Sequence, residues 1–177
     1  MLEASGWSDL ETARSGDAQA AARLLEPLLH PGYRLALAIL RRPEAAQDAV
    51  QDACFNALRS LSRFRGGPGG LRPWFLAIVT NACRSQMRRS WWRWSPLSDE
   101  VAAEDHAEGA AVRLDLAREL GTLRPDQRAV LALFYYLDLP LPEVARVLGV
   151  SEPAARSRLY RAVGLLRQRL GEVEECP

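Results

Sequence analysis

The chain has 177 residues, of which 48% are hydrophobic and 25% are charged, and its net charge is only +1. This length is enough for one ordinary domain or two small ones. No apolar run approaches the roughly 20 residues of a membrane helix, and the N-terminus lacks the basic start and apolar stretch of a secretory signal. Three widely spaced cysteines and two histidines predict neither a disulfide framework nor a zinc site. We therefore expect a reduced, cytoplasmic protein without membrane insertion, metal or cofactor.

Charge is distributed unevenly along the chain. Residues 53–98 contain eight arginines and no acid, residues 99–112 contain five acids and no arginine, and residues 153–170 contain five arginines and no acid. Lysine is absent, so every strongly basic side chain is a guanidinium, whose planar fork suits phosphates and guanine edges. Two basic blocks around an acidic segment favour a nucleic-acid-binding protein with two lobes.

Apolar residues recur at helical spacing, and alternating β-branched runs are absent. Asp17 is placed to cap the first expected helix, and Pro31 and Gly32 are expected to kink the chain. A glycine-rich loop is predicted at 65–70, and the aperiodic stretch after residue 92 is predicted to be a flexible linker. The fold class is all-α, with two small helical lobes at 8–92 and 111–172 joined by the linker 93–110. The expected helices cover 17–30, 33–40, 43–61 and 73–89, and helices resume near residues 111, 126, 141 and 152.

Residues 141–160 carry the clearest motif. A short helix is expected to end at Gly149, a natural left-handed stop, and Ser151 is placed to cap a second helix. One face of this second helix is apolar: Ala155, Leu159, Ala162, Val163, Leu166 and Leu170. The other face is arginine-rich, which is typical of a helix-turn-helix that places its second helix in the DNA major groove. The alternative is an ordinary helical hairpin with solvated arginines, but the absence of acids over 153–170 favours DNA binding.

The segment 123–170 resembles the fourth conserved region of extracytoplasmic-function (ECF) sigma factors. The matching residues are Leu123, Pro125, Tyr135-Tyr136, Glu143-Val144-Ala145, Leu148-Gly149-Val150-Ser151 and Ser157-Arg158-Leu159. In that family the second helix of the motif reads the −35 promoter element. The sequence departs from the family at Pro140, where a Ser or Thr cap is usual, and at Pro153, where glycine is usual. The resemblance implies −35 contacts from Ser151, Arg156, Ser157, Tyr160 and Arg161.

Residues 41–58 resemble the family's helix that docks on RNA polymerase. Acids recur every fourth residue at Glu44, Asp48 and Asp52, with Gln51, Phe55 and Asn56 on the same side. Such a stripe repels itself on an isolated helix, and a basic partner would remove the repulsion, although a merely solvated face is the alternative. The resemblance implies binding to core RNA polymerase through the coiled coil of its largest subunits and through its flap. Cys54 stands where the family usually has an aromatic residue.

Residues 63–90 resemble the family's promoter-melting segment. Arginines on the outer face of a helix can hold the DNA backbone while a preceding glycine loop captures an unstacked base. The loop is one residue longer than is usual in the family. Three tryptophans follow, at 91, 92 and 94, and packing is favoured for them over stacking on single-stranded DNA. The resemblance implies contacts to the −10 element from Arg63, Phe64, Arg65, Thr80, Asn81, Arg84, Met87 and Arg88.

The resemblance extends from about residue 9 to residue 170 and implies a sigma factor that directs promoter-specific transcription initiation. A linker of about 20 residues could extend to about 65 Å, which is close to two turns of DNA and lets the lobes reach two promoter elements. The expected partners are core RNA polymerase, promoter DNA and an anti-sigma factor, the last because the family is commonly held inactive by one.

Three other classes of protein fit the sequence less well. An operator-binding helix-turn-helix regulator that does not join polymerase would leave the acidic helix and the melting segment unexplained. A DNA-acting enzyme is not favoured, because two isolated histidines, no lysine and no phosphate loop leave no catalytic residues. A pure interaction protein would not need two basic blocks free of acids.

Overall fold

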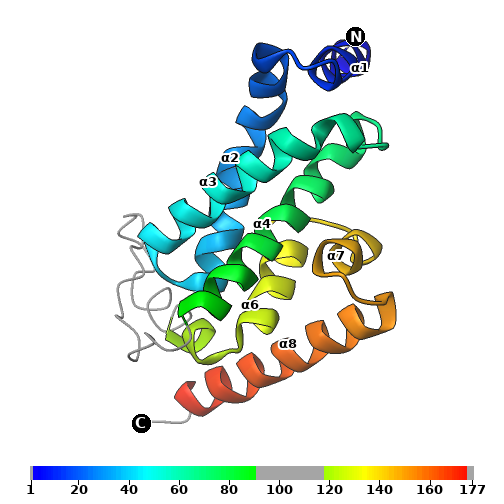
Figure 1. Cartoon of the computed structure of the whole chain (residues 1–177). Coiled ribbons are helices and arrows are strands. Elements are labelled where there is room, and N and C mark those ends of the chain that lie inside the picture. Colours follow the sequence, from blue (N-terminus) through cyan, green and yellow to red (C-terminus); the bar gives the residue numbers. More distant parts are fainter. Residues whose placement is uncertain (1, 91–117, 175–177) are drawn as a thin grey trace.

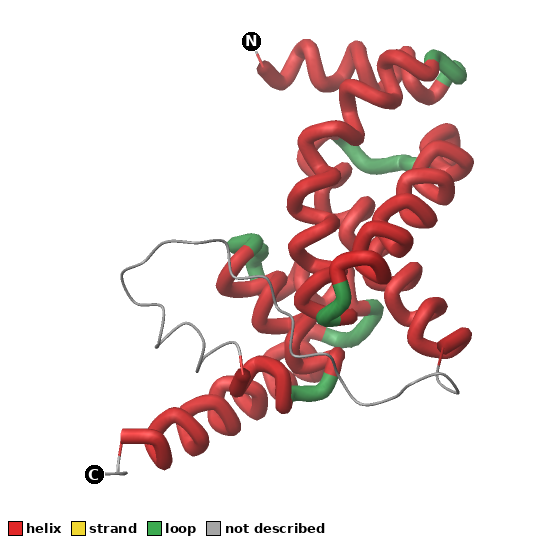
Figure 2. Tube along the Cα trace, turned by 90° about the vertical axis from the view of Figure 1, so that its left-hand side faces the viewer, coloured by secondary structure: helices red, strands yellow, loops and turns green. Residues whose placement is uncertain are grey.

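The computed structural model describes residues 2–90 and 118–174, and every regular element within these ranges is helical (Figure 2). This confirms the all-α fold class. Residues 118–122 are also helical. The predicted linker 93–110, the helix expected near residue 111 and the tryptophans 91, 92 and 94 lie outside the described residues. The elements are α1 Leu2–Arg14, α2 Ala18–Leu40, α3 Pro43–Ser60, the 3-10 turn η1 Leu61–Arg63, α4 Pro68–Ser90, α6 Pro125–Leu131, the π-helical segment η3 Ala132–Tyr136, α7 Leu141–Leu148 and α8 Glu152–Glu174.

Helices α1 to α4 form the N-terminal lobe, in which α2, α3 and α4 all pack against one another (Figure 1). The Asp17 carboxylate accepts a hydrogen bond of 2.7 Å from the Ala20 N–H, so the predicted cap is present. The inner face of α3 consists of small residues, and alanines at this spacing let the neighbouring helices approach closely. Each of these alanines is fully buried: Ala46, Ala49, Ala53 and Ala57.

Two predicted boundaries in this lobe are wrong. Helix α2 runs unbroken through Pro31, where a kink between two helices was expected. Gly32 serves packing there, because a Cβ at this position would lie 2.9 Å from the ring of Phe75. Helix α4 begins at Pro68 rather than Pro73, because proline at the first helical position has the right φ and lacks only an N–H that would be unpaired anyway.

The C-terminal lobe contains the predicted helix-turn-helix. Helix α7 ends at Gly149, which has φ +66°, and the Ser151 hydroxyl accepts a hydrogen bond of 3.4 Å from the Ala154 N–H at the start of α8. On α8 the predicted apolar face is buried at Ala155, Leu159 and Ala162 and half-buried further along. Helices α7 and α8 pack on each other and on α6, so the motif is a rigid unit.

The two lobes pack directly on each other. Helix α7 lies against α4, and α6 lies against the second half of α2 (Figure 1). At the centre of this contact the buried Arg128 of α6 donates hydrogen bonds to the Ala38 and Ile39 carbonyls at 2.7 and 2.6 Å, and also to the Leu123 carbonyl. The last carbonyls of α2 have no partner within the helix, so the guanidinium satisfies them. The sequence predicted two lobes on a flexible linker and gave no indication of this contact.

Candidate functional site

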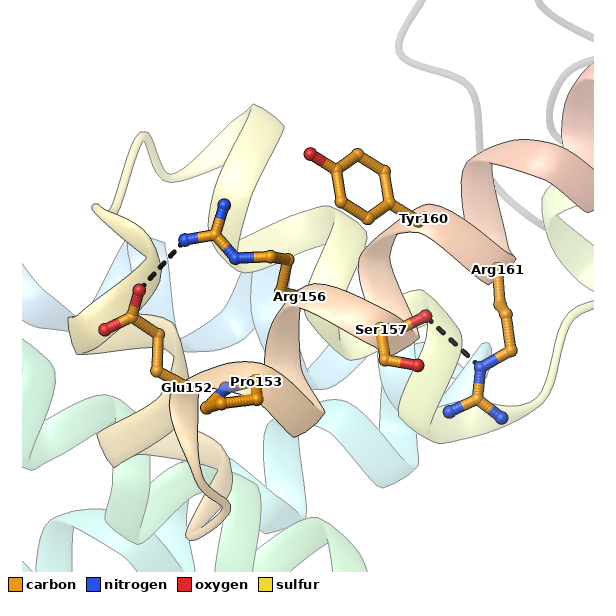
Figure 3. Close-up of a pocket in the computed structure, with 6 residues that line it drawn as sticks. All are labelled: Glu152, Pro153, Arg156, Ser157, Tyr160 and Arg161. Carbon is orange, nitrogen blue, oxygen red and sulfur yellow. Dashed lines mark hydrogen bonds and ion pairs between the residues drawn. The ribbon is translucent and has the colours of Figure 1, made fainter.

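The outer face of α8 is exposed, as the sequence predicted. Figure 3 shows a shallow hollow along this face, lined by Glu152, Pro153, Arg156, Ser157, Tyr160 and Arg161. The Tyr160 ring is 66% exposed and has no packing role that would account for an aromatic residue there. Ser151 is exposed at the N-terminal end of the same helix. A protruding helix with two arginines, a hydroxyl and a tyrosine on its outer face can present hydrogen-bond donors to phosphates and base edges in a major groove.

Two interactions hold the arginines of this face. Arg156 forms an ion pair of 3.0 Å with Glu152, and Arg161 donates from Nε to the Ser157 carbonyl at 3.2 Å (Figure 3). Residues 153–170 contain no acid, yet Glu152, one residue earlier, pairs with Arg156. Exposed pairs of this kind contribute about 0.3–0.5 kcal/mol, so a DNA phosphate can compete with Glu152 for the guanidinium.

The acidic face of α3 is also exposed. Glu44, Asp48 and Gln51 face solvent, and among the described residues neither acid forms an ion pair. Asp52 differs, because its carboxylate is paired with Arg89 of α4 at 3.2 Å. The expected repulsion along the stripe is therefore partly relieved within the chain at its last acid.

An exposed aromatic residue extends this acidic face toward α4. Phe55 is 60% exposed, and Asn56 beside it is also exposed. Both line a groove between α3 and α4 that also contains Asn81, a residue predicted to contact the −10 element. The predicted polymerase surface and the predicted DNA surface therefore meet along this groove.

The residues predicted for the −10 element divide into two groups. Arg63, Arg65, Asn81 and Arg88 are exposed. Thr80 is 1% exposed and donates to the Leu76 carbonyl, and Phe64 is 8% exposed, so the prediction that these two side chains lie on an open surface is wrong. Thr80 precedes Arg84 by one helical turn, and α7 packs against α4.

Arg84 itself is tied to the other lobe. Its Nη2 donates to the Leu148 carbonyl of α7 at 2.8 Å, and its Nη1 donates to Asn81 at 3.4 Å. Burial lowers the pKa of Arg84, with further lowering from the positive charges of Arg158 and Arg88. Met87, one turn on, is half-buried. The helix-turn-helix thus holds Arg84, whereas Asn81 and Arg88 of the same predicted surface stay exposed.

Sequence reasoning missed two arginines that join the lobes. Arg72 of α4 donates to the Leu137 carbonyl at 2.8 Å, and Arg128 binds the end of α2. Burial, and to a lesser degree the positive charge of Arg41, lower the pKa of Arg128 to about 10. The guanidinium still remains charged at neutral pH. The one available signal was an arginine among the apolar residues of 128–134, a position where charge needs a buried partner.

An apolar groove of about 660 Å³ runs between the lobes. Its walls include Leu37, Leu131 and Leu166, and its rim carries Tyr135 and Tyr136, which are 62% and 53% exposed. The guanidinium of Arg34 stacks over the ring of Tyr136 at 4.8 Å. The groove is therefore apolar at its base and basic at its edge.

Comparison with known proteins adds to this geometry. Residues 24–93 match the family model described as sigma-70 region 2, and residues 113–166 match the model described as sigma-70, region 4. The chain is 32% identical to the ECF RNA polymerase sigma factor SigM of Mycobacterium tuberculosis over 158 residues, which cover 89% of this chain and 80% of SigM. It is 28% identical to the RNA polymerase sigma factor SigV of Bacillus subtilis over 144 residues, covering 78% of this chain and 83% of SigV.

Two solved structures have similar folds. The sigma factor RpoE of Bartonella quintana, solved in complex with the anti-sigma factor NepR, aligns with a TM-score of 0.71 at 25% identity, covering 83% of this chain and 94% of RpoE. CnrH, solved in complex with the cytosolic domain of CnrY, aligns with a TM-score of 0.70 at 25% identity, covering 95% of this chain and 98% of CnrH. Within the described residues of the present chain, no helix is long and apolar enough to span a membrane.

Proposed function

Because the chain belongs to the sigma-70 family as an ECF-type RNA polymerase sigma factor, we propose how its surfaces divide the work of transcription initiation. The acidic face of α3 (Glu44, Asp48, Gln51, Asp52, Phe55 and Asn56) docks on core RNA polymerase. The loop before α4 and the outer face of α4 engage the −10 element, and the outer face of α8 reads the −35 element. The observation that carries this division is the separation of charge, with exposed acids on α3 and exposed arginines on α8.

The proposed domain limits are 8–92 for region 2, 93–110 for the linker and 111–172 for region 4. The family matches over 24–93 and 113–166 support them. An operator-binding regulator that does not join polymerase would need only the second of these regions.

The chain acts as an initiation factor, and we assign it no catalytic residue. We place it in the cytoplasm with the polymerase that it serves.

Promoter binding requires the lobes to separate. In the packed arrangement Arg84 is bonded to Leu148 and Thr80 is buried, so a melted strand cannot lie on that face of α4. A linker of about 20 residues reaches about 65 Å, enough for the lobes to part and engage two promoter elements. We therefore assign the packed arrangement to the sigma factor free of polymerase.

An anti-sigma factor is the third proposed partner. RpoE, which this chain resembles across 83% of its length, was solved in complex with the anti-sigma factor NepR. The apolar, arginine-rimmed groove between the present lobes offers an anti-sigma factor a surface that exists only while the lobes are packed.

Run-off transcription tests the proposed function. Core polymerase with the purified chain should give transcripts that start only from templates carrying the cognate promoter, and core polymerase alone should give none. Binding to duplex DNA without any transcript would support the operator regulator. Binding to neither polymerase nor DNA would support a pure interaction protein.

A further inference from the structure

The connection between η1 and α4, residues 64–67, is packed rather than free. A Cβ at Gly66 would lie 2.5 Å from the ring of Phe64, and a Cβ at Gly67 would lie 2.9 Å from the ring of Trp7. Both distances are shorter than those that Cβ atoms show to their neighbours in proteins. Neither glycine has a positive φ, so the backbone conformation does not require glycine there. These glycines are therefore required by the close approach of two aromatic rings, whereas the sequence had indicated a flexible loop.

One arginine of α1 fixes the shape of this connection. Arg14 Nη2 donates to the Phe64 carbonyl at 2.6 Å and to the Gly66 carbonyl at 2.9 Å. The guanidinium also lies 5.8 Å from the centre of the Phe64 ring, which in turn packs on Trp74 at 4.8 Å. A single cationic nitrogen that bridges two carbonyls two residues apart holds the intervening backbone in one conformation.

The direction of Phe64 sets the direction of the residue that follows it. Phe64 has an extended backbone (φ −65°, ψ 121°), and its side chain is buried. Successive side chains of an extended segment point to opposite sides, and Arg65, which follows Phe64, is indeed exposed. Holding the Phe64 ring inward therefore holds Arg65 outward, on the side proposed to meet the −10 element. Arg63, the last residue of η1, is exposed beside it.

We propose that Arg14 is a positioning residue for −10 recognition: it acts through the 64–67 backbone to aim Arg65 at the separated strand. This inference rests on the proposed function of the loop and assigns a role to α1, which precedes the matched region 24–93. Leu10 and Ala13 bury α1 against the lobe independently of Arg14, so removing the guanidinium should leave the helix docked.

The chain offers a matched control. Arg23 also ties α1 to the lobe, through an ion pair of 2.8 Å with Asp9, but it does not touch the 64–67 connection. The variants Arg14→Met and Arg23→Met each remove one guanidinium that holds α1, and only the first frees the loop. Arg14→Lys keeps a cation that can reach one carbonyl, so it should restore part of the function.

The experiment uses reconstituted holoenzyme on a cognate promoter, once as duplex and once with the −10 region already unpaired by mismatches. We expect Arg14→Met to lower open-complex formation on the duplex at least fivefold, to weaken discrimination among −10 sequences, and to leave affinity for core polymerase unchanged. Unpaired template should recover most of the open complex but not the discrimination. Arg23→Met should match the wild type in every measurement.

Several results would overturn the proposal. The first is that Arg14→Met melts the promoter and discriminates among −10 sequences as well as the wild type. The second is that Arg23→Met loses as much open-complex formation and discrimination as Arg14→Met. The third is that Arg14→Lys forms no more open complex than Arg14→Met. If Arg14→Met fails to fold, judged by its helical content, then Arg14→Lys and Gly67→Ala carry the test, because Gly67→Ala displaces the loop from Trp7. A wild-type chain that supports no promoter-dependent transcript would instead overturn the proposed function itself.

Discussion

Arg84 on α4 and Leu148 at the end of α7 are joined by a hydrogen bond of 2.8 Å, although 64 residues separate them in sequence. The bond connects a residue proposed to hold the melted −10 strand with the end of α7, the helix before the one proposed to read the −35 element. Arg84 cannot bind the melted strand while this bond persists. The arrangement links DNA binding by one lobe to the position of the other.

The first prediction concerns lobe packing. Arg128→Met should separate the lobes, because the Ala38 and Ile39 carbonyls would lose charged hydrogen bonds of about 1.5–3 kcal/mol each and would need water instead. A compact chain of this length has a radius of gyration of about 16 Å. Small-angle X-ray scattering should show a clearly larger radius of gyration for Arg128→Met and an unchanged one for Arg23→Met. An unchanged radius with unchanged thermal stability would show that Arg128 does not hold the lobes together.

The second prediction concerns polymerase docking. Asp48→Arg alone should abolish association with core polymerase, because Asp48 is exposed and, within the described chain, unpaired. Asp52→Asn should weaken association less, since Asp52 already shares its charge with Arg89. Glu26→Arg, which reverses an exposed acid on α2, is the control. The measurement is the affinity of each variant for core polymerase, compared among variants of equal helical content. Full binding by Asp48→Arg would show that the acidic stripe is only a solvated face.

How far the sequence predicted the fold depends on the range of the interactions. Local signals correctly predicted that Gly149 ends α7, that Asp17 caps α2 and which faces of α8 are buried and exposed, but they misplaced the helix boundaries at Pro31 and Pro73. Contacts between segments that are distant in the sequence were not predicted. The carbonyls that Arg128 binds lie about 90 residues away in the chain, and no local pattern encodes them.

The candidate site follows the same rule. The exposure of the outer face of α8 follows from the period of that helix alone. The prediction of exposed side chains is therefore confirmed there: Arg156, Ser157, Tyr160 and Arg161. On α4 the periodicity correctly separated Asn81 and Arg88 from the core, but Thr80 is buried and bonded to the Leu76 carbonyl of its own helix. Phe64 is buried because Trp74 and Arg14 approach it from two other helices.

The third prediction concerns the −35 element. Arg156→Ala and Arg161→Ala should each cost about 1–3 kcal/mol of promoter binding and relax preference at one base if the arginine reads a base edge. A phosphate contact would instead lower affinity evenly across sequences and reduce the salt slope by about one unit. Arg124→Ala is the control, because Arg124 is an exposed arginine just before α6. No effect of either α8 substitution on holoenzyme binding would place the DNA on another face of the helix.

The fourth prediction concerns the two described cysteines. Burial raises the pKa of the Cys83 thiol to about 12 and raises that of the half-buried Cys54 by less. Thiolates are the reactive form, so at pH 8 iodoacetamide should label Cys54 slowly and Cys83 only after unfolding, as peptide mass spectrometry can show.

The same shift has a consequence for stability. The unfolded thiol of Cys83 ionises near its ordinary pKa of 9, while the folded thiol keeps its proton. The folded state therefore binds more protons above about pH 9, and this contribution to stability falls as the pH rises from there toward 12. A Cys83→Ala variant should lack that part of the pH dependence. Rapid labelling of Cys83 in the folded chain would contradict the burial on which both expectations rest.

The last prediction concerns melting. Free duplex offers no unstacked base, so the isolated chain should melt no promoter DNA, and melting should require the core polymerase that parts the lobes. In holoenzyme, replacing Arg84 and Arg88 by methionine should reduce open complexes more than closed complexes, because the two arginines lie on the α4 face proposed for the separated strand. Arg88 is already exposed, whereas Arg84 becomes available only when its bond to Leu148 breaks. Arg88→Met alone should therefore impair melting without changing the radius of gyration of the free chain, and Arg84→Met should change both.

Permanganate reactivity of unpaired thymines measures the open complex, and filter binding at low temperature measures the closed one. If the double variant lost both complexes in equal proportion, α4 would be a general phosphate clamp and its assignment to melting would be wrong.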